Sequence, residues 1–157
     1  MIRAGDRILA VGHNHVYYAY PRLLRRALIA AGKPVPDADS APASVPPLKV
    51  RDLEGFSDEE RRLLGQATAK ARVMHAEIHC LAQIESLESV RGADCFIVEL
   101  DSYGLGYEEA VPCPMCNKAL QKLGVARAFY SAHSGLVEEP INYHPELECE
   151  SLDMARG

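Results

Sequence analysis

The stretch Pro112-Cys113-Pro114-Met115-Cys116, taken with His75-Ala76-Glu77 earlier in the chain, decides the fold and the chemistry that the sequence predicts. One imidazole and two thiolates suit Zn²⁺, and a zinc ion held by three protein side chains keeps a fourth tetrahedral position open. Residues i and i+3 share one face of a helix, so Cys113 and Cys116 can reach the same ion. A Cys-x-x-Cys pair alone is a weak signal, because redox motifs also carry it. Together with His75, the pair strongly predicts a zinc site.

Length and composition predict a single domain that covers residues 1–157. Hydrophobic residues make up 48% of the chain and charged residues 25%, values typical of a globular protein. No apolar run is long enough to span a membrane, and the first residues lack the charged-then-apolar pattern of a signal peptide. The odd count of five cysteines fits a metal site better than a set of disulfides. We therefore expect a cytoplasmic protein with no membrane partner.

The charge of the chain bears on its partners. The formal net charge is −5 at pH 7, whereas proteins that hold long stretches of DNA or RNA usually present a basic face. The local basic cluster of Arg22, Arg25 and Arg26 is better explained as the solvated face of a helix. The charge thus favours a small-molecule substrate, and a local groove for single-stranded nucleic acid remains an alternative.

Hydrophobic patterns and turn residues predict alternating helices and strands. Strands are expected at 2–3, 8–11, 94–100, 127–131 and 136–142. Helices are expected at 21–31, 57–70, 75–85 and 113–124, the first opened by Pro21 and the second by a Ser57-Asp58-Glu59-Glu60 capping box. Loops are expected at 33–47, which holds five of the ten prolines, and at 102–110. This order predicts an α/β fold with helices covering a sheet, whose last two strands pair as an antiparallel hairpin.

The motif residues are also those of a known family. The pattern His-x-Glu followed by Pro-Cys-x-x-Cys is the signature of zinc-dependent base deaminases. From about His75 to Ser131 the chain resembles the cytidine deaminase-like superfamily, and a weaker similarity covers 7–14. This superfamily includes deaminases of free cytidine, deoxycytidylate, tRNA adenosine and polynucleotide cytosine. The resemblance implies a three-layer α/β/α sandwich with a mixed sheet, and Zn²⁺ as the cofactor.

The resemblance also implies roles for individual residues. His75, Cys113 and Cys116 match the zinc ligands of the superfamily. Glu77 matches its proton shuttle, a role that also follows from the chemistry: one carboxylate can accept a proton from water and then donate it to the ring and the leaving amine.

Five residues are expected to contact the substrate. Asn14 matches an asparagine that contacts the ribose or the base in the superfamily. The resemblance implies that the backbone N–H groups of Ala76 and the ligand Cys113 line the pocket, and Pro112 is expected to contact the substrate beside them. Tyr103 and Tyr107 could stack on a flat base, because aromatic faces bind bases without sequence demand. Packing within their own loop is the alternative for these two tyrosines.

Two features depart from the superfamily pattern. Its members usually begin with a helix and a full first strand, whereas this chain begins almost at the turn before the strand at 8–11. About sixty residues also separate Asn14 from His75, much more than the usual connection. We expect a zinc-site core at about 72–132 and a helical, proline-rich insertion at about 16–71 that could shape the pocket or bind a partner.

The sequence therefore predicts a zinc-dependent hydrolytic deaminase that converts a cytosine ring to uracil with release of ammonia. Cytidine, deoxycytidine or a nucleotide is the favoured substrate, because the hairpin-like end resembles the free-cytidine branch and the branch of secreted bacterial deaminase toxins more than the tRNA and polynucleotide branches. One alternative is a deaminase of single-stranded DNA or RNA, or of adenine or guanine. A second is an inactive, zinc-stabilised interaction subunit, which the presence of Glu77 disfavours. The resemblance also leaves a homo-oligomer open.

Overall fold

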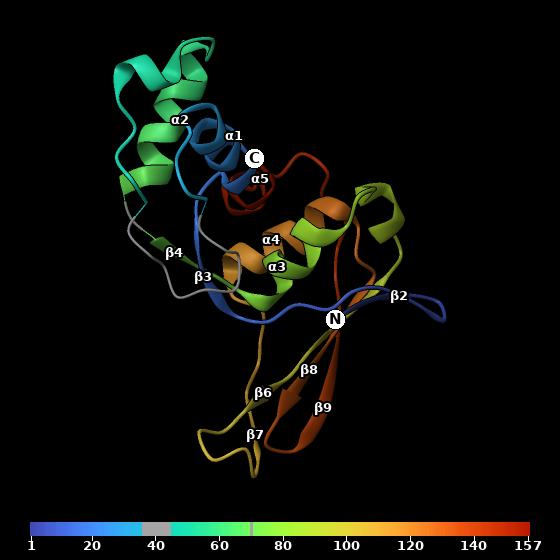
Figure 1. The fold of residues 1–157 in the computed structure, drawn as a ribbon. Coiled ribbons are helices and arrows are strands. Elements are labelled where there is room, and N and C mark those ends of the chain that lie inside the picture. The colour runs from blue at the N-terminus through green and yellow to red at the C-terminus, as the bar shows by residue number, and fades with distance from the viewer. Residues whose placement is uncertain (36–44, 70) are drawn as a thin grey trace. The chain divides into compact units, whose positions relative to one another are not determined.

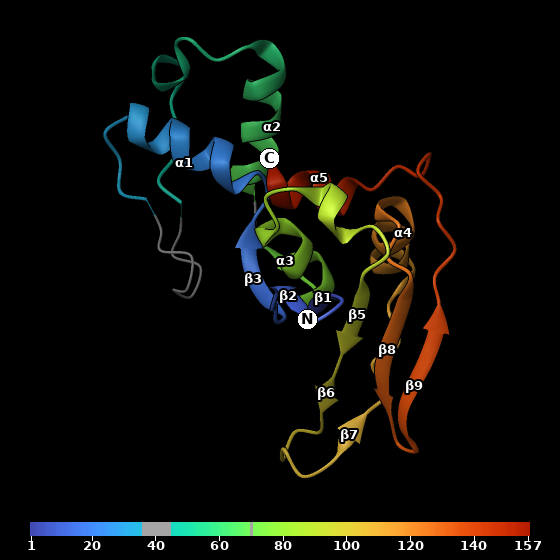
Figure 2. The same cartoon turned by 90° about the vertical axis from the view of Figure 1, so that its right-hand side faces the viewer.

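The computed structural model describes residues 1–35, 45–69 and 71–157 (Figures 1 and 2). The chain forms two compact units. The first comprises Met1–Asn14 and His75–Leu152, and the second comprises His15–Met74 and Asp153–Gly157. Most of the expected proline-rich loop, residues 36–44, lies outside the described residues, as does Lys70 at the expected end of a helix.

A five-stranded mixed sheet forms the centre of the first unit. Its strands stand in the order β2-β1-β5-β8-β9. Their bounds are Ile2–Ala4 for β1, Arg7–Ala10 for β2, Asp94–Ile97 for β5, Arg127–Ala132 for β8 and Gly135–Pro140 for β9. The β5 and β8 strands run parallel, and the other pairs run antiparallel. The predicted α/β class, the mixed sheet and the antiparallel final pair are therefore confirmed.

Side chains alternate between the two faces of this sheet, as the pleat of a strand requires. Cys95 and Ala128 pair in register and are at most 1% exposed. The next pair, Phe96 and Phe129, lies on the other face, where the two rings stack with centroids 4.8 Å apart. The guanidinium of Arg127 covers the Phe129 ring at 5.0 Å. One face is thus an apolar core, and the other carries aromatic rings screened by charged groups.

Two helices of the first unit carry the motif residues. The helix α3 (Ala76–Gln83) follows His75, and α4 (Pro114–Leu123) follows Cys113, so each begins at the residue after a predicted metal ligand. Proline is favoured in the first helical turn, where its missing N–H would have no partner. Gly124 ends α4 with φ of 72°, a left-handed conformation that suits glycine. Both helices therefore begin and end close to the predicted residues.

A short two-stranded ribbon extends beyond β5 (Figure 2). The expected strand at 94–100 is interrupted at Val98, and β6 (Glu99–Leu100) then pairs with β7 (Tyr107–Glu108) instead of joining the main sheet. The expected loop at 102–110 thus contains a strand. The Asp101 carboxylate holds the turn between them by accepting the backbone N–H groups of Tyr103 and Leu105 at 3.0 and 2.9 Å.

The second unit is mainly helical, and its helices α1 and α2 lie side by side (Figure 1). Its elements are β3 (His15–Tyr18), α1 (Pro21–Ala30), the 3₁₀ turn η1 (Val50–Leu53), α2 (Asp58–Ala69) and β4 (Ala71–Met74). The buried core comprises Leu24, Ala27, Leu28, Phe56, Leu64 and Ala67. The capping box is confirmed, because the Ser57 N–H donates to Glu60 and the Glu60 N–H donates to Ser57.

Besides β7 and the 3₁₀ turns η1 and η2 (Leu87–Val90), three elements were absent from the expected set. The antiparallel pair β3 and β4 joins His15 to Met74 at one end and Tyr18 to Ala71 at the other. The helix α5 (Glu150–Arg156) ends the chain. Among the helices of the described residues, none has the length and apolar character needed to cross a bilayer.

Candidate active site

The three predicted zinc ligands lie together in the first unit. The Nδ1 atom of His75 is 3.4 Å from the Cys113 sulfur and 3.5 Å from the Cys116 sulfur. A tetrahedral zinc ion, with Zn–S of about 2.3 Å and Zn–N of about 2.0 Å, would separate such atoms by about 3.5 Å. The spacing of the donor atoms therefore fits Zn²⁺.

The chemistry of the donor set also fits a cation. Burial raises the pKa of the Cys116 thiol above its ordinary value, and the negative charges of Glu77 and Cys113 raise it further. A divalent cation among these groups would offset both effects, because a coordinating thiol is deprotonated outright. The backbone N–H of Cys116 additionally donates to the Cys113 sulfur at 3.5 Å, which holds that sulfur close to the other two donor atoms. These residues could hold zinc, with His75 bound through Nδ1.

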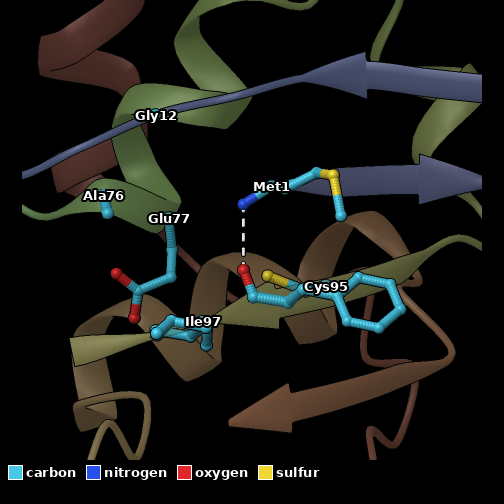
Figure 3. A pocket seen from close by; sticks show the side chains of 8 residues that line it. Met1, Gly12, Ala76, Glu77, Cys95 and Ile97 are labelled. Carbon is cyan, nitrogen blue, oxygen red and sulfur yellow. Dashed lines mark hydrogen bonds between the residues drawn. The ribbon is translucent and has the colours of Figure 1, made fainter. Parts of the chain in front are cut away.

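Glu77 is a buried carboxylate at the start of α3. The residue is only 7% exposed, although a carboxylate is normally found in solvent. It lines two adjoining hollows, one of about 360 Å³ that also contains His75 and Cys113, and a smaller one of about 240 Å³. Figure 3 shows the smaller hollow, with the Glu77 carboxylate near Ile97. We call the larger hollow the cleft.

A close approach of backbone fixes the position of α3. A Cβ atom added to Gly12 would lie 2.5 Å from the Ala76 carbonyl oxygen and 2.7 Å from the Cys80 nitrogen. Cβ atoms essentially never come within 3.0 Å of heavy atoms beyond their own residue and its two chain neighbours. The chain after β2 can therefore pass over the first turn of α3 only because residue 12 has no side chain.

Asn14 lies in the cleft and is bonded to the same helix. Its side-chain oxygen accepts the backbone N–H of Ala76 at 2.8 Å, which satisfies one of the free donors at the start of α3. This bond uses the amide oxygen of Asn14, so the amide nitrogen is the group that it can offer to a ligand. The same bond occupies the Ala76 N–H, which was expected to line the pocket.

Ser131 is hydrogen-bonded to both segments that form the acidic walls of the cleft, Glu99 on one side and Glu108–Ala110 on the other. Its buried hydroxyl donates to the Glu108 carbonyl at 2.8 Å and accepts the backbone N–H of Glu99 at 3.1 Å. Its own carbonyl accepts the N–H of Ala110 at 2.9 Å. One residue of β8 thus fixes both the strand that carries Glu99 and the segment that leads into Cys113.

The remaining expected contacts are less closely grouped. Tyr103 and Tyr107 lie on the β6–β7 ribbon, with 84% and 57% of their surfaces exposed, and they are not among the residues that line the cleft. Pro112 lies between two residues that do line it, Val111 and Cys113. The structure thus brings together the predicted ligands, Glu77, Asn14 and Ala76, and leaves the two tyrosines outside.

Sequence reasoning missed several residues of the cleft: Gly12, His13, Glu99 and Glu109 line it, and Ser131 supports it. A signal existed for Glu99, which follows the parallel strand β5 closely, because residues after the carboxyl ends of parallel strands line the clefts of α/β proteins. A signal also existed for Gly12, as a glycine directly after a strand. Ser131 gave none, because its role depends on which backbone groups face it.

The comparison with known families agrees with this geometry. Residues 1–132 match the model of the cytidine and deoxycytidylate deaminase zinc-binding region. No curated protein and no solved structure matches the chain. The match includes all three donor residues, so Zn²⁺ is the cofactor, and the family implies a nucleoside, nucleotide or nucleic-acid substrate. The chain therefore belongs to the family defined by the cytidine and deoxycytidylate deaminase zinc-binding region.

Proposed function

We propose that this protein is a hydrolytic deaminase that replaces the amino group of a cytosine ring, in a nucleoside or nucleotide, with oxygen. One observation carries the proposal: a buried carboxylate, Glu77, lines the same cleft as His75 and Cys113, two of the three donors that converge. The ligand roles of His75, Cys113 and Cys116 are part of the proposal. A zinc ion held by three ligands supplies a nucleophilic water near neutral pH.

The chain itself must move protons during this reaction. Water adds to C4 of the ring, N3 gains a proton, and the bond from C4 to the amino nitrogen then breaks. Ammonia leaves readily only after its nitrogen is protonated. Glu77 accepts the proton that the attacking water loses and delivers protons to the ring nitrogen and to the leaving amine. The balance is cytosine plus water giving uracil plus ammonia.

The other residues of the cleft orient the ring and exclude bulk water. Asn14 is held by its bond to Ala76, so its amide nitrogen can donate to an acceptor on the substrate. Ile97 and Val98 provide apolar surface beside Glu77, against which a flat ring can pack.

The test is deamination by the zinc-loaded protein. A panel of nucleobases, nucleosides, nucleotides and short oligonucleotides is incubated with it, and mass spectrometry follows the gain of about one dalton when an amine becomes a carbonyl. Glu77→Gln should lower the rate by about 10²- to 10⁴-fold while one zinc per chain remains bound. The exposed Glu88→Gln is the matched control and should leave the rate unchanged. Retained turnover in Glu77→Gln would remove Glu77 from the mechanism.

The alternative of an inactive, zinc-stabilised subunit makes the opposite forecast. A module of that kind needs the three ligands, but it has no use for a carboxylate buried beside them. If no compound in the panel is converted by protein with full zinc content, this alternative replaces the proposed activity.

A further inference from the structure

The walls of the cleft carry negative charge that the proton shuttle does not require. Besides Glu77, the carboxyl-bearing residues Glu99 and Glu109 line the cleft. Among the described residues, those lining the cleft include no lysine and no arginine. A phosphate-binding site is normally built the other way, with guanidinium or ammonium groups or a free helix N-terminus facing the anion.

The sequence around the cleft has the same bias. Between Arg91 and Lys118 the chain contains five acidic residues and neither lysine nor arginine. The negative charge of Asp94 is neutralised by a bidentate salt bridge from Arg127, with N–O distances of 2.9 and 2.8 Å. The other four acids stand on the β6–β7 ribbon and the segment after it: Glu99, Asp101, Glu108 and Glu109.

The acidic walls are held in place by the fold. The Ser131 hydroxyl joins the backbone of Glu99 to that of Glu108, and the Ser131 carbonyl holds Ala110, the neighbour of Glu109. Movement of either acidic segment away from the cleft would break a hydrogen bond to Ser131. One of the free N–H donors at the start of α3, that of Ala76, is also already bonded to Asn14.

We propose that Glu99 and Glu109 restrict the cleft to substrates without phosphate, so that it accepts the free base or the nucleoside and rejects the 5′-monophosphate and the polynucleotide. This inference rests on the proposed function, which does not distinguish nucleosides from nucleotides as substrates. A 5′-phosphate near neutral pH carries a charge of about −1.5 to −2, and two carboxylates close to it repel it. In a polynucleotide the flanking phosphates would meet the same walls.

The experiment compares cytidine, deoxycytidine, their 5′-monophosphates and a short deoxycytidine oligonucleotide. Two readouts are used: kcat/KM of the zinc-loaded protein, and calorimetric binding to zinc-loaded Glu77→Gln, which does not depend on turnover. We expect the nucleosides to exceed the monophosphates by about tenfold or more at low salt, and the gap to shrink to about threefold in 0.5 M salt as screening weakens the repulsion.

The double variant Glu99→Gln/Glu109→Gln tests the residues directly. It should raise kcat/KM for the monophosphates by about five- to tenfold and change that for the nucleosides by less than about twofold. The matched control Glu88→Gln/Glu148→Gln removes the same charge at exposed positions that do not line the cleft, and it should leave the nucleoside-to-nucleotide ratio unchanged.

The outcomes separate the two proposals. Equal binding or turnover of nucleoside and monophosphate, no binding of either, or an equal effect of the control pair would overturn the role of Glu99 and Glu109. If the monophosphate or the oligonucleotide is deaminated faster than the nucleosides, the role of Glu99 and Glu109 is also refuted, whereas the proposed deaminase activity is supported. Selective binding of the nucleoside without any deamination would support the acidic cleft and refute the proposed activity.

Discussion

Replacing Gly12 with alanine tests how tightly the segment after β2 is packed on α3. The added methyl group would stand 2.5 Å from the Ala76 oxygen, 2.7 Å from the Cys80 nitrogen and 2.9 Å from the Cys80 sulfur, where ordinary contacts are 3.4–4 Å. Two of these three atoms belong to the backbone, so no side-chain rotation can relieve the clash. The helix and the segment must separate by almost 1 Å.

The size of the effect follows from that displacement. Inserting a methyl group into a packed interior costs about 1–3 kcal/mol. For a chain of 150–250 residues, each kcal/mol lowers the melting midpoint by about 2–4 °C, so the variant should melt about 2–12 °C lower. Because α3 carries Glu77 and begins at His75, an ångström of movement should also reduce kcat/KM by up to about 10²-fold.

Gly65 provides the matched control. It lies within α2, and a Cβ atom there would have nothing within 4 Å. Alanine costs about 0.5–1 kcal/mol less than glycine inside a helix, so Gly65→Ala should raise the free energy of unfolding by that amount. The two variants are compared by calorimetric melting of the zinc-loaded protein and by deaminase assay. If Gly12→Ala melts within a degree of the parent protein and keeps its activity, the close approach is not a feature of the folded chain.

Three further predictions concern individual side chains. Ser131→Ala leaves two backbone groups of the cleft without a partner and should cost about 1–3 kcal/mol in urea unfolding and raise KM, while Ser134→Ala in the exposed hairpin turn should do neither. The pKa of Glu60 lies below its ordinary value because the Ser57 backbone N–H and, to a lesser extent, the Arg26 side chain bind its carboxylate. The ionised Glu60 therefore stabilises the fold above the ordinary glutamate pKa, and this stabilisation is lost as pH falls through the lowered pKa. Urea midpoints at pH 7 and pH 3 should therefore differ less for Glu60→Gln than for the parent, and equal differences would contradict the capping box. Burial raises the pKa of Cys95 to about 12. The protonated thiol therefore contributes fully to the free energy of unfolding below the thiol pKa of the unfolded chain, and this contribution is lost as pH rises towards 12. The metal-free protein should be less stable at pH 10.5 than at pH 8, and Cys95→Ala should flatten that decline; a decline of the same slope in the variant would assign it to other groups.

The parts of the fold that the sequence predicted are those determined by local chemistry. The capping box at Ser57, the proline at the start of α1 and the glycine after α4 each act on backbone groups within a few residues. The hairpin of β8 and β9 follows from two apolar runs around a short turn. Such signals can be read from a window of about ten residues.

The missed elements depend on partners distant in the chain. The pairing of β3 with β4 joins residues more than fifty positions apart, and each strand has only four residues. The strand β5 ends before Val98, and Glu99 and Leu100 pair with β7 instead. The residues around Val98 contain no local pattern that indicates this change of partner. The helix α5 has seven residues, too few for a clear helical period. In the cleft, Glu99 and Glu109 were missed because charged side chains usually face solvent, whether they stand on a short strand, as Glu99 does, or in a loop, as Glu109 does.

The pairing of His15 with Met74 has a consequence for the long segment between them. His15 and Met74 form the first pair of the β3–β4 ladder, so the chain leaves and returns at adjacent positions. Asn14, which precedes the ladder in the chain, accepts a hydrogen bond from Ala76, which follows it. The four pairs of the β3–β4 ladder thus fix where the segment between Tyr18 and Ala71 leaves and returns, whatever the length of that segment.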